Sequence, residues 1–166
     1  MEKFKSSYSK PMLLATCFLF IVVLFTICIV VNQLVKLPVS SSSFIGISIV
    51  LCFMLATLLY SFFSQIKYVC LTRENVIIKK MVGKIVIPRC DIGQVQHKKS
   101  LGADIRLWGI SGLFGHIGWF WSKGVGRYLA FVKDGNSMLE IKTERKCYVV
   151  SCDDYEEVIK LLKEGC

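Results

Sequence analysis

Two apolar segments of equal length decide how this chain is organised. Residues 12–31 read MLLATCFLFIVVLFTICIVV, and residues 44–63 read FIGISIVLCFMLATLLYSFF. Each holds 20 residues without a charge, and a bilayer core about 30 Å thick needs about 20 residues in a helix. Because an unpaired backbone amide is costly in lipid, such segments cross a membrane as helices. The sequence therefore predicts a transmembrane helical hairpin followed by one soluble domain.

The charges that flank these segments predict how the hairpin is inserted. The N-terminal end carries three lysines and one acid, and the stretch after the second segment is rich in lysine and arginine, whereas the link between the segments carries only Lys36. Positive flanks stay in the cytoplasm. We expect a multi-pass protein of the cell membrane with a cytoplasmic N-terminal tail (1–11), a hairpin (12–63) and a cytoplasmic domain (64–166). A signal peptide is the alternative for the first segment, but that segment exceeds an ordinary signal core and no A-x-A site follows it.

The net charge and the cysteines limit the classes of function. The chain carries a formal net charge of +9, and residues 64–166 hold 17 lysines and arginines against 11 acids. This surplus suits contact with anionic lipid headgroups, with nucleic acid as the competing partner, and an ordinary lysine excess on a cytoplasmic face explains it as well. The eight cysteines form no CxxC pair and no zinc-ligand spacing with a histidine. We expect them to be structural and unlinked, as in a reducing compartment.

Short strands separated by turns are predicted from residue 66 to residue 151. Tyr68, Cys70 and Thr72 alternate with apolar neighbours, which is typical of a strand half-buried in a sheet. Asp134-Gly135 is suited to the tight turn of a hairpin. Six further strands are predicted at residues 76–78, 85–87, 92–95, 126–133, 138–142 and 147–151. Short strands at this spacing predict a small barrel or sandwich.

The end of the chain has the pattern of an amphipathic helix. Its apolar stripe repeats at i, i+3, i+4 and i+7, in Tyr155, Val158, Ile159 and Leu162. Asp153 and Glu156 have the spacing of a capping box at the start of this helix, and Gly165 is suited to ending it. We expect the helix to close an open end of the barrel.

Residues 102–128, the glycine-aromatic segment, are the most unusual part of the chain. They hold seven of the twelve glycines and all three tryptophans. The candidate lipid or partner contacts are Arg106, Trp108, Phe114, Trp119, Trp121, Lys123 and Arg127. Indole rings favour the headgroup level of a bilayer, where nearby cations meet lipid phosphates. The segment is therefore either a loop that dips into the inner leaflet or a set of aromatic residues packed on the domain or between the spans.

Four short runs carry a resemblance to a known family: Ile92-Gly93-Gln94-Val95, Ser111-Gly112-Leu113-Phe114-Gly115, Gly118-Trp119-Phe120 and Gly126-Arg127-Tyr128. They resemble the bacterial pleckstrin-homology (PH)-like domains, in the membrane-anchored group with two N-terminal transmembrane helices. The resemblance covers residues 66–162. It implies an all-β domain, namely a bent barrel of seven strands capped by a C-terminal α-helix, and it implies no enzymatic activity and no specific ligand-binding residue.

No catalytic signature is present in the sequence. There is no P-loop, the glycines at positions 124 and 126 lack the third glycine of a dinucleotide turn, and neither His97 nor His116 belongs to an H-E-x-x-H motif. The acids of residues 153–157 are explained by capping and by the helix dipole. We therefore predict no catalytic residue, no cofactor and no metal ion.

Two non-catalytic functions from different classes remain. The preferred one is a protein-interaction or assembly module at the cytoplasmic membrane face, which docks another membrane protein or a second copy through strand edges or the glycine-aromatic segment. The alternative is a module for anionic phospholipids, in which the cations hold headgroups and the tryptophans enter the interface. Vesicle binding that weakens with salt would favour the lipid module, and salt-insensitive self-association the interaction module. No nucleic acid is expected, because a dense stripe of lysine and arginine is missing.

Overall fold

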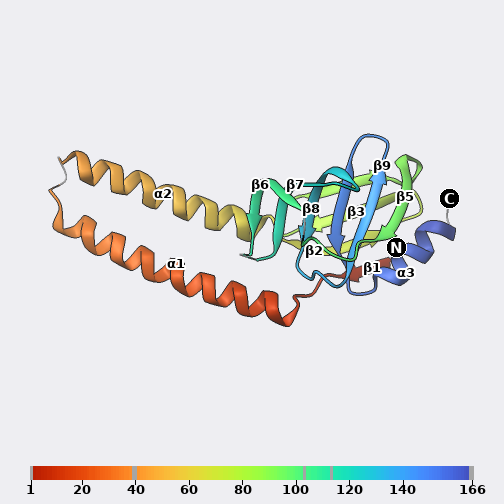
Figure 1. The fold of residues 1–166 in the computed structure, drawn as a ribbon, viewed down its shortest axis with the longest axis horizontal. Coiled ribbons are helices and arrows are strands. Elements are labelled where there is room, and N and C mark those ends of the chain that lie inside the picture. The colour runs from red at the N-terminus through yellow and green to blue at the C-terminus, as the bar shows by residue number, and fades with distance from the viewer. Residues whose placement is uncertain (1, 39–40, 103, 113, 165–166) are drawn as a thin grey trace.

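Two long helices project from one end of a β-rich domain (Figure 1). The structure is a computed structural model that describes residues 2–38, 41–102, 104–112 and 114–164. The helices are α1 (Lys10–Lys36) and α2 (Ser42–Phe63), and both are long and apolar enough to span a membrane. Most of their large apolar side chains are exposed. A core helix of a soluble protein would bury such side chains, so this exposure favours a lipid environment.

Both helices are longer than the apolar segments 12–31 and 44–63 that predict them. Pro11 lies in the first turn of α1, a position where proline is favoured because its missing N–H has no helical partner. Ser41 caps α2, and its hydroxyl accepts a hydrogen bond from the main-chain N–H of Phe44 at 3.1 Å. The starts of the helices are therefore set by these signals rather than by hydropathy alone.

The first sheet contains four antiparallel strands in the order β1-β2-β3-β4. They are β1 (Glu2–Lys5), β2 (Ile66–Leu71), β3 (Asn75–Lys80) and β4 (Lys84–Pro88). The description of residues 1–11 as a tail needs correction, because β1 pairs with β2 along its whole length. Phe4 is buried, with 6% of its surface exposed, and joins the core. A strand of four residues with one apolar side chain is too short to show a period in the sequence.

The second sheet contains six strands in the order β5-β9-β10-β8-β7-β6. They are β5 (Ile92–His97), β6 (Ile105–Ser111), β7 (His116–Ser122), β8 (Gly126–Val132), β9 (Met138–Thr143) and β10 (Cys147–Ser151), and a 3-10 turn, η1 (Arg89–Asp91), precedes β5. The predicted hairpin around Asp134-Gly135 is wrong: β10 lies between β8 and β9 and runs parallel to β8. The Asp134 carboxylate accepts from the Asn136 N–H and the Ser137 hydroxyl, so this connection is a wider turn with its own hydrogen bonds.

The C-terminal helix, α3 (Tyr155–Glu164), packs on the core between the sheets. Its residues Val158 and Leu162 are buried, as the apolar stripe predicts. The predicted capping box is not formed, because the Asp153 carboxylate accepts hydrogen bonds from the N–H and hydroxyl of Ser7 at 2.8 and 2.7 Å. A residue outside the helix takes the capping oxygen. Gly165, the predicted end of the helix, lies outside the described residues.

The segment between β1 and α1 belongs to the domain as well. The hydroxyl groups of Ser6 and Ser151 are 2.7 Å apart and buried. The hydroxyl of Tyr8 donates to the side-chain oxygen of Gln65, and Lys133 Nζ lies 4.7 Å from the centre of the Tyr8 ring. Burial holds the pKa of Lys133 below its usual value and raises that of Tyr8 to about 12. The chain that enters α1 is thus fixed to the domain that follows α2.

The expected architecture is confirmed: a helical hairpin precedes an all-β domain whose core is covered by a C-terminal helix. All seven predicted strands are present, as β2 to β5 and β8 to β10. Three strands were not predicted, namely β1 and the pair β6 and β7. The last two arise from the glycine-aromatic segment.

Candidate functional site

The glycine-aromatic segment folds as a β-hairpin rather than a loop. β6 pairs with β7 in antiparallel register, and Gly109 faces Gly118 across the pair. Their φ angles are 125° and 132°, and a Cβ on either would lie 2.2 Å from a main-chain oxygen of the facing strand. Only glycine fits at these two positions. The glycines therefore allow a close strand pair to form where the sequence suggests an irregular loop.

One side of the hairpin, the tryptophan face, is formed by Ile105, Trp108, Trp119 and Trp121. The register pairs Trp108 with Trp119 and Ile105 with Trp121, so the four side chains share a side of the sheet. Trp108 is 76% exposed, Ile105 57% and Trp121 41%. Large apolar side chains grouped and exposed in this way make this side of the hairpin a candidate contact surface.

Two of the three predicted cations border this face. The Arg127 guanidinium lies 4.7 Å from the centre of the Trp119 ring, a cation–π contact. Lys123 is exposed in the turn between β7 and β8. Arg106 pairs with Phe120 and so lies on the opposite side of the hairpin. The structure therefore divides the predicted cluster between two surfaces.

The hairpin tip, the turn between β6 and β7, contacts both long helices. The Phe114 ring lies 6.5 Å from that of Phe20 in α1 and 5.8 Å from that of Phe62 in α2. The Phe114 N–H donates to the hydroxyl of Thr16 at 3.2 Å, and this hydroxyl lies 3.3 Å from the main-chain oxygen of Gly112. The φ of Phe114 is 59°, the only positive φ of a non-glycine residue in the described part of the chain. A residue keeps such a strained backbone conformation only where the surrounding contacts hold it in place.

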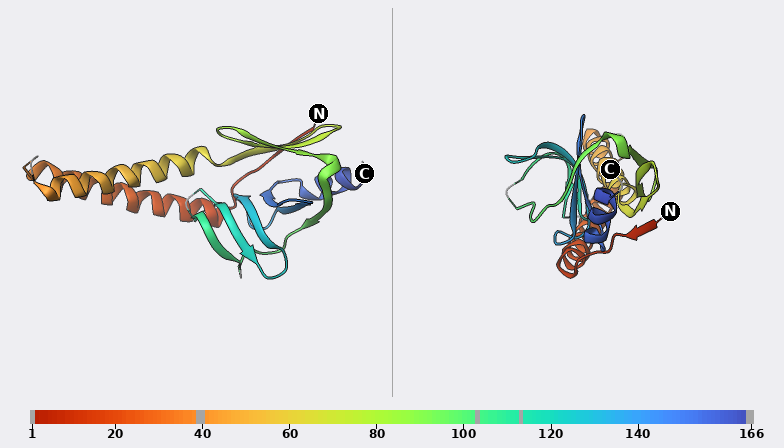
Figure 2. Two further views of the ribbon diagram at one scale, coloured as in Figure 1. Left: turned by 90° about the horizontal axis from the view of Figure 1, so that it is seen from above. Right: turned by 90° about the vertical axis from the view of Figure 1, so that its right-hand side faces the viewer.

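β6 is the edge strand of the second sheet and lies nearest to the helices. β7, β8 and the rest of the sheet follow it along the long axis of the molecule, away from the helices (Figure 1). Figure 2 shows the hairpin beside the start of α1 from a second direction. The sheet thus stands with one edge toward the helical hairpin, and the tryptophan face begins at that edge.

The structure brings together five of the seven candidate residues: Trp108, Trp119, Trp121, Lys123 and Arg127. Phe114 is separate, because it packs on the helices. The contacts of Thr16, Phe20 and Phe62 with the tip were not predicted. At position 16, the only signal for such a contact was a hydroxyl in an apolar segment. A hydroxyl of this kind usually bonds to its own helix. That of Thr16 does so as well, since it donates to the main-chain oxygen of Met12 at 2.8 Å.

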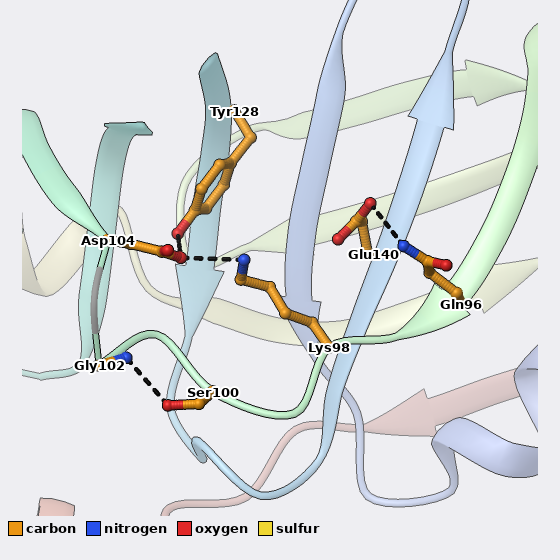
Figure 3. A network of polar contacts seen from close by, with 7 residues as sticks. All are labelled: Gln96, Lys98, Ser100, Gly102, Asp104, Tyr128 and Glu140. Carbon is orange, nitrogen blue, oxygen red and sulfur yellow. Dashed lines mark hydrogen bonds and ion pairs between the residues drawn. The ribbon is translucent and has the colours of Figure 1, made fainter. Parts of the chain in front are cut away.

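A buried polar network lies on the other side of the sheet (Figure 3). Lys98 Nζ is 2.9 Å from the Asp104 carboxylate, and the two side chains are 8% and 7% exposed. The Tyr128 hydroxyl donates to the same carboxylate, and the ammonium lies 4.8 Å from the centre of the Tyr128 ring. Burial alone would raise the pKa of Asp104, but hydrogen bonds from Tyr128, Lys98 and Ser122 outweigh it and hold that pKa below its usual value. The network therefore fixes the loop before β6.

Glu140 extends this polar layer into the sheet. It is 4% exposed, and one carboxylate oxygen accepts from the Gln96 amide at 3.0 Å. Burial, with Glu140 nearby, raises the pKa of the Cys147 thiol to about 12. This thiol is therefore protonated and unreactive at neutral pH. Within the described residues, no cluster of His, Cys, Asp and Glu side chains could hold a metal ion.

The comparisons with known proteins agree with the fold. No curated protein and no solved structure matches the chain. The model of the bacterial PH domain family matches residues 67–165, which cover the two sheets from β2 onward and α3. The chain therefore belongs to the bacterial PH domain family.

Proposed function

We propose that this protein is a membrane-anchored, non-catalytic contact module whose tryptophan face contacts anionic lipid headgroups at its β6 edge. PH domains are generally non-catalytic modules. The observation that carries the proposal is the 76% exposure of Trp108 on the strand nearest to the two helices. Tryptophan is the residue that most favours the boundary between hydrocarbon and water.

The depth of the hairpin tip supports this placement. Thr16 lies four residues after Met12, where the uncharged segment begins, which is about 6 Å along a helix. In a bilayer spanned by α1 and α2, a tip bonded to Thr16 reaches the boundary of the hydrocarbon core. β6 then runs at headgroup level, where its unpaired edge groups find water and phosphate oxygens as partners.

The charges near the tryptophan face favour an acidic leaflet. Arg127 and Lys123 border the face, and each Lys or Arg near an anionic surface contributes about 1 kcal/mol at low screening.

We further propose that both ends of the chain are cytoplasmic in a multi-pass protein of the cell membrane. Two observations support this: β1 and β2 pair, so both ends of the helical hairpin are on one side, and positive charges flank it there.

A protein-interaction or assembly module remains the alternative use of the same face. The geometry disfavours strand addition at β6, because the next strand position lies toward the helices (Figure 1). A partner would therefore have to bind side chains of the tryptophan face rather than the strand edge.

Depth-dependent quenching of single tryptophans in the full chain tests the proposal. The variant with Trp119→Phe and Trp121→Phe retains Trp108, and the variant with Trp108→Phe and Trp119→Phe retains Trp121. In vesicles of phosphatidylcholine and phosphatidylglycerol, we expect shallow quenchers to act on both tryptophans more strongly than deep ones. Absence of quenching at either depth, with salt-insensitive self-association, would instead assign the face to a protein partner.

A further inference from the structure

We propose that the cleft on the side of the hairpin opposite the tryptophan face binds a phosphate group. The cleft has a volume of about 700 Å³, and its side chains include Lys99, Arg106, Ser111, His116, Phe120 and Asn136. It lies between the loop before β6, the hairpin itself and the turn between β8 and β9. This size suits a small organic ligand.

The cleft has an excess of positive charge. Its cations are Lys99 and Arg106, and its single carboxylate is Asp104. That carboxylate is already bound by Lys98 and Tyr128. Among the residues that the structure describes, neither Lys99 nor Arg106 has a carboxylate within ion-pair distance. An anion that enters the cleft therefore meets two unpaired cations and a neutralised acid.

Neutral hydrogen-bonding groups complete the arrangement. The Ser111 hydroxyl lies 2.6 Å from His116 Nδ1 at the end of β6 and the start of β7. Burial lowers the pKa of His116 below its usual value, and the nearby Arg106 lowers it further. A bound anion would raise this pKa, because it favours the protonated ring. A phosphate, with several acceptor oxygens in a tetrahedral arrangement, can accept from Arg, Lys and hydroxyl donors at once, which a planar carboxylate does less well.

Two sources could supply this phosphate group. One is the headgroup of a phospholipid beside the protein, because β6 is the strand nearest to the helices. The other is a soluble phosphate ester. The cleft and the tryptophan face lie on opposite sides of the hairpin. The phosphate site therefore does not depend on the proposed contact between tryptophans and headgroups, and tryptophan quenching does not report on it.

The two histidines of the chain provide the measurement. We would record NMR spectra of the full chain with ¹³C-labelled histidine in maltoside micelles, which contain no phosphate, and assign the signals with His116→Gln. Inorganic phosphate is added at constant ionic strength, with chloride as the replaced anion. We expect a saturable shift of the His116 signal and a raised His116 pKa. The His97 signal should move much less, since its ring is stacked on Tyr155, 4.5 Å away, and His97 does not itself line the cleft but reaches it through Nε2, 3.2 Å from the main-chain oxygen of Asn136.

Charge variants test whether the shift arises in the cleft. Lys99→Gln with Arg106→Gln should weaken phosphate binding by about tenfold or more, because charge-assisted hydrogen bonds are lost. Lys142→Gln with Arg145→Gln removes the same charges from exposed positions outside the cleft and should leave binding unchanged. A cooperative unfolding transition like that of the wild type shows that each variant is folded.

Nanodiscs distinguish the two sources. A His116 shift that grows with the phosphatidylglycerol fraction, without soluble phosphate, identifies a lipid headgroup. A shift with inorganic phosphate alone identifies a soluble ester. The proposal is overturned if His116 responds in neither arm, or if the cleft variant and the control variant bind equally well.

Discussion

The main-chain N–H of Phe114 donates to the hydroxyl of Thr16 across 3.2 Å, and this bond joins the tip of the β6–β7 hairpin to α1. Two other contacts act at the same end of the domain. The N–H of Met81 donates to the main-chain oxygen of Gln65 at 2.8 Å, and that of Val82 to the main-chain oxygen of Phe63 at 3.1 Å. The β3–β4 turn thus binds the end of α2 as the hairpin tip binds α1. The domain is held against the helices at several points rather than by a flexible linker.

Thr16→Val should loosen the hairpin tip without changing its shape. The substitution removes the hydroxyl that accepts from Phe114, and loss of one such hydrogen bond costs about 1 kcal/mol. Hydrogen exchange of the Phe114 amide should therefore accelerate by about fivefold.

Thr26→Val is the matched control, because the Thr26 hydroxyl donates only to the main-chain oxygen of Val22 in its own helix. Equal exchange rates at Phe114 in the two variants would show that the bond does not hold the tip.

Gly118→Ala should disrupt the hairpin, and Gly124→Ala should not. A Cβ at position 118 would lie 2.2 Å from the main-chain oxygen of Trp108, and the φ of 132° is itself unfavourable for alanine. Backbone strain of this kind costs about 1–3 kcal/mol before the clash is counted. Among the described residues, no atom apart from those of the adjoining residues lies within 4 Å of a Cβ at Gly124. Thermal unfolding should show a lower midpoint for the first variant only, and similar midpoints would contradict the close strand pairing.

These glycines explain why the hairpin could not be predicted from the sequence. Glycine weakens strand propensity in general, and only the facing partner shows that Gly109 and Gly118 are required. The same holds for β10, whose insertion between β8 and β9 depends on long-range pairing and not on the Asp134-Gly135 pattern. The helical hairpin and α3 were predictable because their signals are local: apolar length and a repeat of 3.6 residues. The aromatic and cationic composition predicted the candidate contact residues, but only the register separates Arg106 from Trp108.

Phe4→Ala should destabilise the domain although it precedes both helices. Phe4 is 6% exposed and packs in the core cluster shared by the two sheets and α3. Replacement of a buried phenylalanine by alanine costs about 3–5 kcal/mol. Urea unfolding of the full chain should show this loss, whereas Glu2→Ala, at an exposed position of the same strand, should have little effect. Equal stability of both variants would mean that β1 is dispensable and that residues 1–11 act only as a tail.

Cysteine labelling tests the proposed orientation in the membrane. Cys90 is exposed, whereas Cys70, Cys147 and Cys152 are buried, and burial raises the pKa of the last two thiols to about 12. In a Cys166→Ser background, a membrane-impermeant maleimide should give labelling only after the cells are permeabilised, and this labelling should be lost when Cys90→Ser is added.

Lys36→Cys in the Cys90→Ser, Cys166→Ser background is the control for the opposite side, because position 36 is exposed at the end of α1. It should be labelled in intact cells. Labelling of Cys90 itself in intact cells would reverse the proposed topology.

Asp104→Asn should change how stability depends on pH. The pKa of Asp104 is lower in the folded protein than the unfolded value of about 3.9, so the unfolded chain binds its proton more readily. Its contribution to the free energy of unfolding is therefore complete above about pH 5 and is lost as the pH falls through the folded pKa. The variant leaves Lys98 buried without its charge partner. Asp104→Asn should therefore be less stable than the wild type at pH 7, and the difference in the free energy of unfolding should narrow in acid.

Asp91→Asn, at an exposed position, should preserve the wild-type dependence of stability on pH. Urea unfolding measured from pH 7 to pH 3 gives the comparison, and parallel profiles for wild type and Asp104→Asn would show that the buried pair does not couple to protonation.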